Sequence, residues 1–168
     1  MPKSTTLADS KKIIGIDPGS KRIGYGVIEK IGSSLRLVDA GLLKVASHSN
    51  PSALLETKSH LEELIKKFRP SVLAVEKLYF VRNQKTAFAV SENRGVVMLV
   101  AAENNLKIQE YSPNEVKQGV AGYGSADKKA VLKMVRIILG EKNLEVIDDA
   151  SDALALAILA SQKRAFEC

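Results

Sequence analysis

Two carboxylates stand at the ends of two short hydrophobic runs, where they could share one site. Asp17 follows the run at 13–16, and Glu76 follows the run at 72–75. Each run is typical of a buried strand, and a lone buried charge is costly unless it is paired or binds a metal. If the two strands are neighbours, both carboxylates lie at the sheet edge where ligand sites are often found. The alternative for each is that it is simply the first solvated residue after its strand.

Three more carboxylates, Asp148, Asp149 and Asp152, lie at the start of the last predicted helix. Asp148 has the position of an ordinary N-cap, and Asp149 could do no more than complement the helix dipole. Asp152 lies three residues after Asp149, so both project from one face, where like charges repel. Because residues 153–156 are all Ala or Leu, this face should be buried. Metal binding is therefore favoured over capping as the explanation of Asp149 and Asp152.

Together, Asp17, Glu76, Asp149 and Asp152 predict a metal site made only of oxygen ligands. Ligands without cysteine or clustered histidine suit Mg²⁺, with Mn²⁺ as a substitute, rather than zinc. Two such ions, about 4 Å apart, would activate a water and stabilise the leaving oxygen in phosphodiester cleavage. The predicted chemistry is therefore metal-dependent hydrolysis of a nucleic-acid backbone.

Basic and aromatic residues near these carboxylates predict a contact with nucleic acid. Lys117 and Lys128 bracket a glycine-rich loop at 119–124, where backbone N–H groups and a helix N-terminus can meet a phosphate. A second group follows Glu76 and combines rings that stack on unpaired bases with cations that attract phosphates. This group consists of Tyr79, Phe80, Arg82 and Lys85. The alternatives are that one ring points into the core and that the charges only solvate the surface.

Length and composition favour one domain with a substantial core, because the chain has 168 residues and 45% of them are hydrophobic. We expect a disordered lead-in over residues 1–10 and a single domain over 11–168. The net charge of +6 favours a phosphate-bearing partner. Cys168 is the only cysteine, so we expect no disulfide framework and a reducing, intracellular compartment. Neither a signal peptide nor a membrane span is expected.

The hydrophobic pattern predicts strands first and then alternating strands and helices, which is the order of an α/β or α+β fold with a mixed sheet. Strands are expected at 13–16, 24–28, 35–43, 72–75 and 107–111. Helices are expected at 50–69, at about 85–104, from 113, at about 125–139 and from about 148. Ser112 and Glu115 form a capping-box pattern, and Ser125 is predicted to cap the following helix. Apolar residues surround the helix at 96–102, so we expect it to be covered on more than one side.

Several short motifs, which occur in order along residues 13–160, resemble those of the RuvC family of bacterial Holliday junction resolvases. They are Gly15-Ile16-Asp17-Pro18-Gly19, Gly24-Tyr25-Gly26, Val75-Glu76 with a following aromatic and Asn83, Arg94-Gly95, Val116-Lys117-Gln118, the block at 122–128 and the block at 149–155. The resemblance implies an RNase H-like α/β fold with a five-stranded mixed sheet flanked by helices. It also implies a homodimer that binds a four-way DNA junction and nicks two opposing strands symmetrically with a divalent metal, leaving 5′-phosphates.

On this resemblance, the four carboxylates are the metal-binding catalytic residues, and Tyr79 acts at the opened centre of the junction. Lys117 and Lys128 lie near the scissile phosphate, and the helix from Lys85 supplies much of the dimer interface. A branch-migration complex of the RuvA–RuvB kind is a candidate partner, and the bacterial cytoplasm is the expected location.

The chain departs from the family pattern at Lys77, where Gln is common, and at Tyr79, where Phe is usual. These departures bear on cleavage preference and junction opening, not on the metal site. The segment 21–24 also resembles the related YqgF family, but the Asp-x-x-Asp helix favours RuvC. Two other classes remain as alternatives. An actin-like ATP-binding fold needs a second lobe that this length does not accommodate, and a silent nucleic-acid-binding module predicts the loss of some carboxylates.

Overall fold

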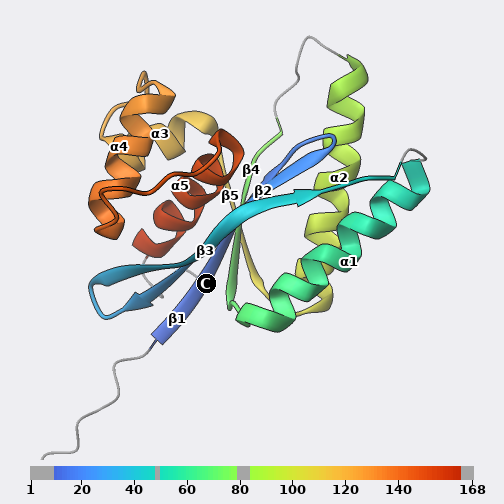
Figure 1. Cartoon of the computed structure of the whole chain (residues 1–168), viewed down its shortest axis with the longest axis horizontal. Coiled ribbons are helices and arrows are strands. Elements are labelled where there is room, and N and C mark those ends of the chain that lie inside the picture. Colours follow the sequence, from blue (N-terminus) through green and yellow to red (C-terminus); the bar gives the residue numbers. More distant parts are fainter. Residues whose placement is uncertain (1–9, 48–49, 79–83, 164–168) are drawn as a thin grey trace, which may run out of the picture.

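A five-stranded sheet lies between two layers of helices (Figure 1), as seen in a computed structural model that describes residues 10–47, 50–78 and 84–163. The strands are β1 (Ser10–Pro18), β2 (Arg22–Ile31), β3 (Ser34–Lys44), β4 (Val72–Glu76) and β5 (Lys107–Tyr111). Their order across the sheet is β3-β2-β1-β4-β5. The first three strands pair antiparallel, whereas β4 runs parallel to β1 and β5 parallel to β4. The predicted mixed sheet is confirmed.

The antiparallel strands are joined by short turns, which keep them adjacent in the sheet. Gly32, in the turn between β2 and β3, has a φ of 60°, a backbone conformation that glycine adopts without a steric penalty. Because β1 already begins at Ser10, most of the expected lead-in lies outside the described residues. The division of the chain into a lead-in and one domain therefore stays a prediction.

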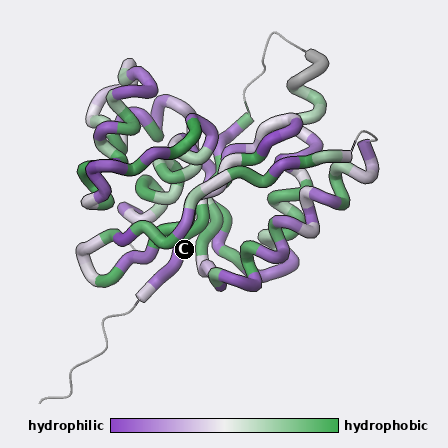
Figure 2. Tube along the Cα trace, in the orientation of Figure 1, coloured by the Kyte–Doolittle hydropathy of each residue, from purple (hydrophilic) through white to green (hydrophobic). Residues whose placement is uncertain are grey.

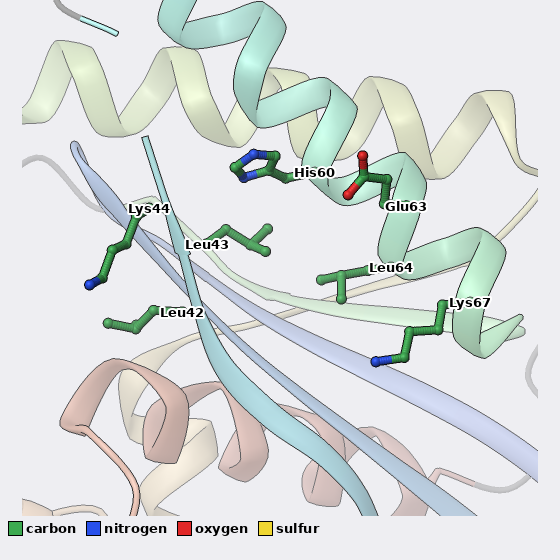
Figure 3. Close-up of a pocket in the computed structure, with 7 residues that line it drawn as sticks. All are labelled: Leu42, Leu43, Lys44, His60, Glu63, Leu64 and Lys67. Carbon is green, nitrogen blue, oxygen red and sulfur yellow. The ribbon is translucent and has the colours of Figure 1, made fainter. Parts of the chain in front are cut away.

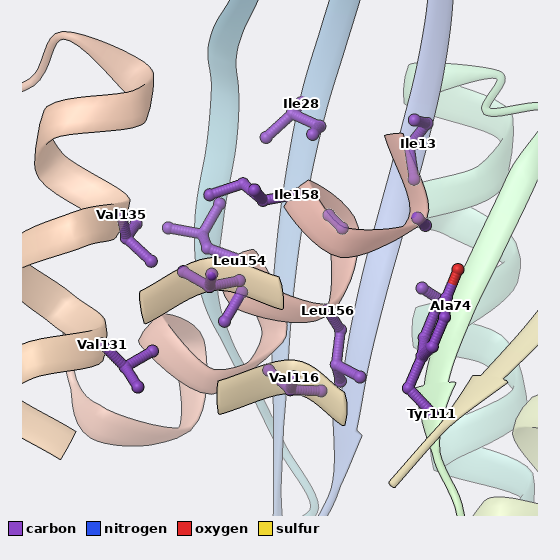
Figure 4. Close-up of a cluster of buried hydrophobic side chains, with 14 of the residues drawn as sticks. Ile13, Ile28, Ala74, Tyr111, Val116, Val131, Val135, Leu154, Leu156 and Ile158 are labelled. Atoms are coloured by element: carbon purple, nitrogen blue, oxygen red, sulfur yellow. The ribbon is translucent and has the colours of Figure 1, made fainter. Parts of the chain in front are cut away.

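The two faces of the sheet are covered by different helices (Figure 1). α1 (Asn50–Phe68) and α2 (Gln84–Glu103) pack on one face, and α3 (Pro113–Ala121), α4 (Lys128–Leu139) and α5 (Asp148–Gln162) pack on the other. Because strand side chains alternate, Ile14 and Ile16 of β1 pack in the cluster that contains α1 and α2, and Ile13 packs in the cluster that contains α5. Figure 4 shows this second cluster, where Leu154, Leu156 and Ile158 of α5 face the strands.

Hydrophobic residues concentrate along the central strands, and hydrophilic residues recur along the surrounding helices (Figure 2). This distribution matches a sheet that is buried on both faces. Among the described residues, no helix combines the length and the apolar character needed to cross a membrane.

The helix termini confirm one capping prediction and correct two others. Ser112 and Glu115 form the predicted capping box at the start of α3. Ser125 does not cap α4. Asp127 does, because it lies directly before the first helical residue and its side chain accepts a hydrogen bond from the Ala130 backbone N–H. Asp148 is likewise not an N-cap, since it already lies within the first turn of α5.

α2 packs against the sheet and against α1, so the expected cover on more than one side is confirmed, but this cover is incomplete. Val97, Val100 and Ala101 are buried against the sheet. On other sides of the helix, Phe88 is 71% exposed and Leu99 is 53% exposed. The physical reason is that one sheet and α1 cannot enclose a helix that is apolar around much of its circumference. Part of α2 therefore presents apolar side chains to solvent.

Candidate metal-binding and nucleic-acid-binding site

The ends of two parallel strands place Asp17 and Glu76 on the same face of the sheet. Ile16 of β1 pairs with Val75 of β4, so the two carboxylate residues follow at matching positions on neighbouring strands. Asp17 lies two residues beyond Gly15, on the face that α5 covers, and the alternation along β4 puts Glu76 on that face as well. Both residues are half-buried.

Helix α5 reaches this edge because the strand residues beneath it are glycines. A Cβ on Gly15 would collide with the carbonyl oxygen of Ala153. Gly24, which pairs with Asp17 across the strands, lies beneath Asp149, and a Cβ there would collide with the Asp149 carbonyl oxygen. The missing side chains let the backbone of α5 approach the sheet closely. As a result, the first turns of α5 lie over the end of β1.

The negative charges of the four carboxylates act on one another at this edge. Burial and then the charges of Asp152, Glu76 and Asp149 raise the pKa of Asp17 to about 7. Burial and then the charge of Asp152 also raise the pKa of Glu76. Such shifts arise where carboxylates share a poorly solvated site, and they are common at functional sites. The structure therefore brings residues of β1, β4 and α5 into one electrostatic group.

Two lysines partly offset this negative charge. The Lys128 Nζ lies 3.2 Å from an Asp152 carboxylate oxygen and 3.9 Å from one of Asp148. The hydrogen bond to Asp152 raises the pKa of Lys128. The charges of Lys128 and Lys117 in turn act to lower the pKa of Glu76, against the effect of burial. The side chain of Asp148 is 75% exposed, so Asp148 lies at the outer margin of this cluster of carboxylates.

The predicted lysines and two of the carboxylates line one pocket of about 190 Å³. Its wall also includes residues of α3, α4 and α5. The lining residues are Glu76, Pro113, Val116, Lys117, Lys128, Val131, Asp152 and Leu156. A pocket lined by apolar side chains, carboxylates and cations can admit a phosphate beside a bound metal.

The donor chemistry of the four carboxylates fits a divalent cation. Oxygen ligands suit Mg²⁺ and Mn²⁺, and a cation would relieve the mutual repulsion that raises the pKa of Asp17. Within the described ranges, no group of three or more histidine, cysteine, aspartate or glutamate side chains has the arrangement needed to hold a metal ion. Instead, Lys128 contacts Asp152, and the Arg22 guanidinium lies 3.5 Å from Asp149.

Several predicted nucleic-acid contacts fall where the structure gives no description. Tyr79, Phe80 and Arg82 lie outside the described residues, and so does the side chain of Lys85, whose backbone belongs to the first turn of α2. Their proposed roles stay predictions.

Two residues of α2 that contact the strand ends were missed by the sequence analysis. Asn93 is buried and bonds to the turn after Asp17, and Arg94 bonds to the backbone of Glu76. The available signal is a pair of polar residues that one glycine separates from the apolar segment 96–102. The sequence singles out Arg94 only as part of a family-like motif.

A second pocket, of about 430 Å³, lies between β3 and α1 and contains none of the predicted site residues (Figure 3). Its lining combines apolar and charged side chains, namely Leu42, Leu43, Lys44, His60, Glu63, Leu64 and Lys67. Because α1 covers the sheet face opposite to α5, this pocket is separate from the carboxylates.

Comparisons with known proteins agree with this geometry. Residues 13–160 match the family model described as crossover junction endodeoxyribonuclease RuvC. A relative of that name from Natranaerobius thermophilus is 46% identical over 151 residues, which cover 89% of this chain and 94% of the relative. One from Desulfitobacterium hafniense is 47% identical over 147 residues, covering 87% and 89% of the two chains.

Solved structures extend the likeness to three dimensions. A structure described as T. thermophilus RuvC in complex with Holliday junction substrate matches with a TM-score of 0.84 at 33% identity, covering 90% of this chain and 93% of that one. The yeast mitochondrial Holliday junction resolvase Ydc2 matches with a TM-score of 0.65 at 13% identity, covering 92% and 81%, which shows a shared fold only. The predicted RNase H-like fold is confirmed. A family model matches most of the chain, and curated relatives are nearly 50% identical to it over most of its length. The chain therefore belongs to the RuvC family.

Proposed function

We propose that this protein is a Holliday junction resolvase, a metal-dependent endonuclease that makes paired, symmetric nicks in opposing strands of four-way DNA junctions. The observation that carries the proposal is the convergence of four carboxylates from β1, β4 and α5 beside two lysines, in a member of the RuvC family. The T. thermophilus relative in complex with a Holliday junction substrate supports the choice of DNA structure. The reaction is phosphodiester hydrolysis that leaves a 5′-phosphate, in recombination and repair.

In this proposal Asp17, Glu76, Asp149 and Asp152 hold Mg²⁺, with Mn²⁺ as a substitute and two ions in each site. When bound, the ions supply an activated water and a counter-charge for the leaving oxygen. Asp17 has a pKa of about 7, so near neutral pH it carries a proton part of the time. That proton passes to solvent when the carboxylate becomes a ligand, which couples metal binding to pH.

The lysines at the rim act on the DNA backbone. Lys117 and Lys128 line the pocket together with Glu76 and Asp152, which places two cations beside the carboxylates. We propose that they attract and orient the scissile phosphate and stabilise the charge that develops on it. Lys128 is paired with Asp152 in the structure, so to contact the phosphate its ammonium must turn from that carboxylate.

Paired nicks in two opposing strands need two active sites, and we propose that two copies of this chain supply them. The exposed apolar residues Phe88 and Leu99 of α2 are a suitable contact surface for a second copy. Tyr79, Phe80, Arg82 and Lys85 are proposed to contact the DNA. A branch-migration complex of the RuvA–RuvB kind, within the bacterial cytoplasm, is the proposed physiological setting.

The test is a nicking assay on synthetic four-way, flapped and linear DNA, assayed side by side with and without Mg²⁺. We expect Mg²⁺-dependent paired nicks in the four-way substrate and little cleavage of linear DNA. Asp17→Asn, Glu76→Gln and Asp152→Asn are each expected to abolish cleavage while junction binding persists, because each removes a negative ligand oxygen.

Asp148→Asn is the matched control, since this exposed carboxylate lies on the same helix and outside the proposed ligand set. It is expected to retain cleavage. Full activity in any one of the three ligand variants would remove that residue from the metal site. Equal cleavage of linear and four-way DNA would reject the junction assignment.

A further inference from the structure

Two consecutive residues of α2 reach across the sheet edge to the backbone beside the two strand-end carboxylates. Asn93 is 3% exposed, and its side-chain nitrogen donates to the carbonyl oxygens of Gly19 at 2.8 Å and Ser20 at 3.3 Å. Its side-chain oxygen lies 3.2 Å from the Thr57 hydroxyl oxygen, which donates to it. The side-chain nitrogen of Asn93 therefore holds the turn that follows Asp17, and its oxygen is fixed by Thr57 of α1.

Arg94 holds the other strand end. Its Nε lies 3.0 Å from the carbonyl oxygen of Glu76, to which it donates, and its Nη2 pairs with the carboxylate of Glu110. The side chain is only 16% exposed. Glu110 lies on β5 opposite Val75, so one guanidinium joins α2 to the ends of both β4 and β5. A charged donor with two fixed partners and little solvent exposure is a stronger constraint than a surface ion pair.

The position of these contacts matters because Glu76 is the last residue of β4. Within a strand, ladder hydrogen bonds on either side fix the backbone and thereby the direction of each side chain. Beyond Glu76 the described ladder continues only as far as the Lys77 N–H, which donates to the Tyr111 carbonyl at 2.8 Å. A small rotation of the Glu76 peptide would redirect its carboxylate, and the Arg94 bond opposes that rotation.

We propose that Arg94 is a positioning residue for the metal site, with Asn93 holding the neighbouring turn. Arg94 fixes the backbone of Glu76 and thereby limits where the Glu76 carboxylate can lie relative to that of Asp17. It acts through Glu76 and does not itself touch metal or DNA. This inference rests on the proposed function, because it takes Glu76 to be a metal ligand.

The experiment measures Mn²⁺ binding to the DNA-free protein by calorimetry, so that it does not depend on cleavage. Arg94→Met removes both donors, and we expect Mn²⁺ to bind at least about tenfold more weakly, as is typical when a partner behind a metal ligand is lost. Arg94→Lys retains a cation for Glu110 but lacks the Nε donor, and we expect it to restore only part of the affinity. Should Arg94→Met fail to fold, Arg94→Lys carries the same test.

Glu103→Gln is the matched control. It breaks another ion pair of α2, in which the Lys58 Nζ lies 2.8 Å from a Glu103 oxygen, far along the helix from the carboxylates. This variant is expected to bind Mn²⁺ as the unmodified protein does, even where its melting temperature falls as much as that of Arg94→Lys. Equal weakening by the control would show a general loss of stability and would overturn the inference.

A double variant separates positioning from a general effect. Because Arg94 acts through Glu76, adding Arg94→Met to Glu76→Gln should weaken Mn²⁺ binding no further. The same loss from Arg94→Met in both backgrounds, or an unchanged affinity in Arg94→Met alone, would overturn the inference. If Glu76→Gln itself leaves Mn²⁺ binding intact, then Glu76 is not a ligand, and the proposed metal site fails together with this inference.

Discussion

The two faces of the sheet are built from different kinds of residue, and only one of them lies next to the carboxylates. On the face covered by α5, Gly15 and Gly24 let a helix backbone approach the strands, and the carboxylates gather at the edge of that contact. On the face covered by α1 and α2, large residues such as Leu61 and Ile16 fill the space instead. The comparison teaches that close approach of backbones creates the site, whereas ordinary packing of the other face holds the strands beneath it.

The largest effect is expected from closing the gap on the α5 face. Gly24→Ala would place a Cβ against the backbone of Asp149, which must move away. We expect cleavage to fall by about 100-fold, since a displacement near 1 Å at a catalytic group has that order of effect. Overpacking of this kind should also lower the free energy of unfolding by about 1–3 kcal/mol. Nicking rates and chemical denaturation measure the two effects.

The matched control for this variant lies on the other face. Leu61→Ala should lower the free energy of unfolding by about 2–5 kcal/mol, because the side chain of Leu61, on α1, is fully buried. At a temperature where this variant remains folded, we expect it to cleave junctions normally. A similar loss of cleavage in Leu61→Ala would show that the two faces do not differ in the way described.

The next effect concerns assembly and belongs to the outer side of α2. Leu99→Glu puts a charge on an exposed apolar position, and we expect sedimentation to show a shift from dimer towards monomer. A residue central to an interface contributes on the order of 2 kcal/mol, or about 30-fold in the dissociation constant. Ile137→Glu is the control, because Ile137 is equally apolar and 59% exposed but lies on α4. A dimer unchanged by Leu99→Glu would contradict the proposed use of α2.

A smaller effect is expected in the stability of the metal-free protein. In the native state Asp17 titrates at about 7 instead of 3.8, so between these pH values the folded protein binds more protons than the unfolded chain. Stability contributed by this group is therefore lost as the pH rises through the window. Asp17→Asn removes the free-energy cost of keeping this carboxylate charged in the folded protein. At pH 8 the substitution should therefore raise the free energy of unfolding by on the order of 2 kcal/mol.

At pH 5 the same substitution should have much less effect, because Asp17 is then mostly protonated and uncharged in the native protein. Chemical denaturation in the presence of a chelator compares the two pH values. A difference between Asp17→Asn and the unmodified protein that does not change with pH would show that the burial and repulsion of Asp17 are weaker than described.

The sequence predicted the strand-end carboxylates because strand patterns are local. An apolar run that stops at Asp17 or Glu76 can be recognised from neighbouring residues alone, and the pair of Asp149 and Asp152 follows from helical spacing. The family-like motifs then predicted the fold. These signals need no knowledge of which elements touch.

Two of the missed features depend on contacts between distant segments. Gly24 is required because of the backbone of Asp149, more than a hundred positions later in the chain. Arg94 matters because of the Glu76 carbonyl, and no local pattern marks a side chain that bonds to a strand end. The misplaced cap at Ser125 has a simpler cause, since Asp127 is an equally good capping residue two positions later.

The central claim, that Asp17, Glu76, Asp149 and Asp152 together hold divalent cations, can be tested by anomalous diffraction from crystals soaked in Mn²⁺. We predict anomalous density between the ends of β1 and β4 and the first turns of α5, with these carboxylates as its protein ligands. Density at another place, or none at a Mn²⁺ concentration that supports full cleavage, would contradict the claim.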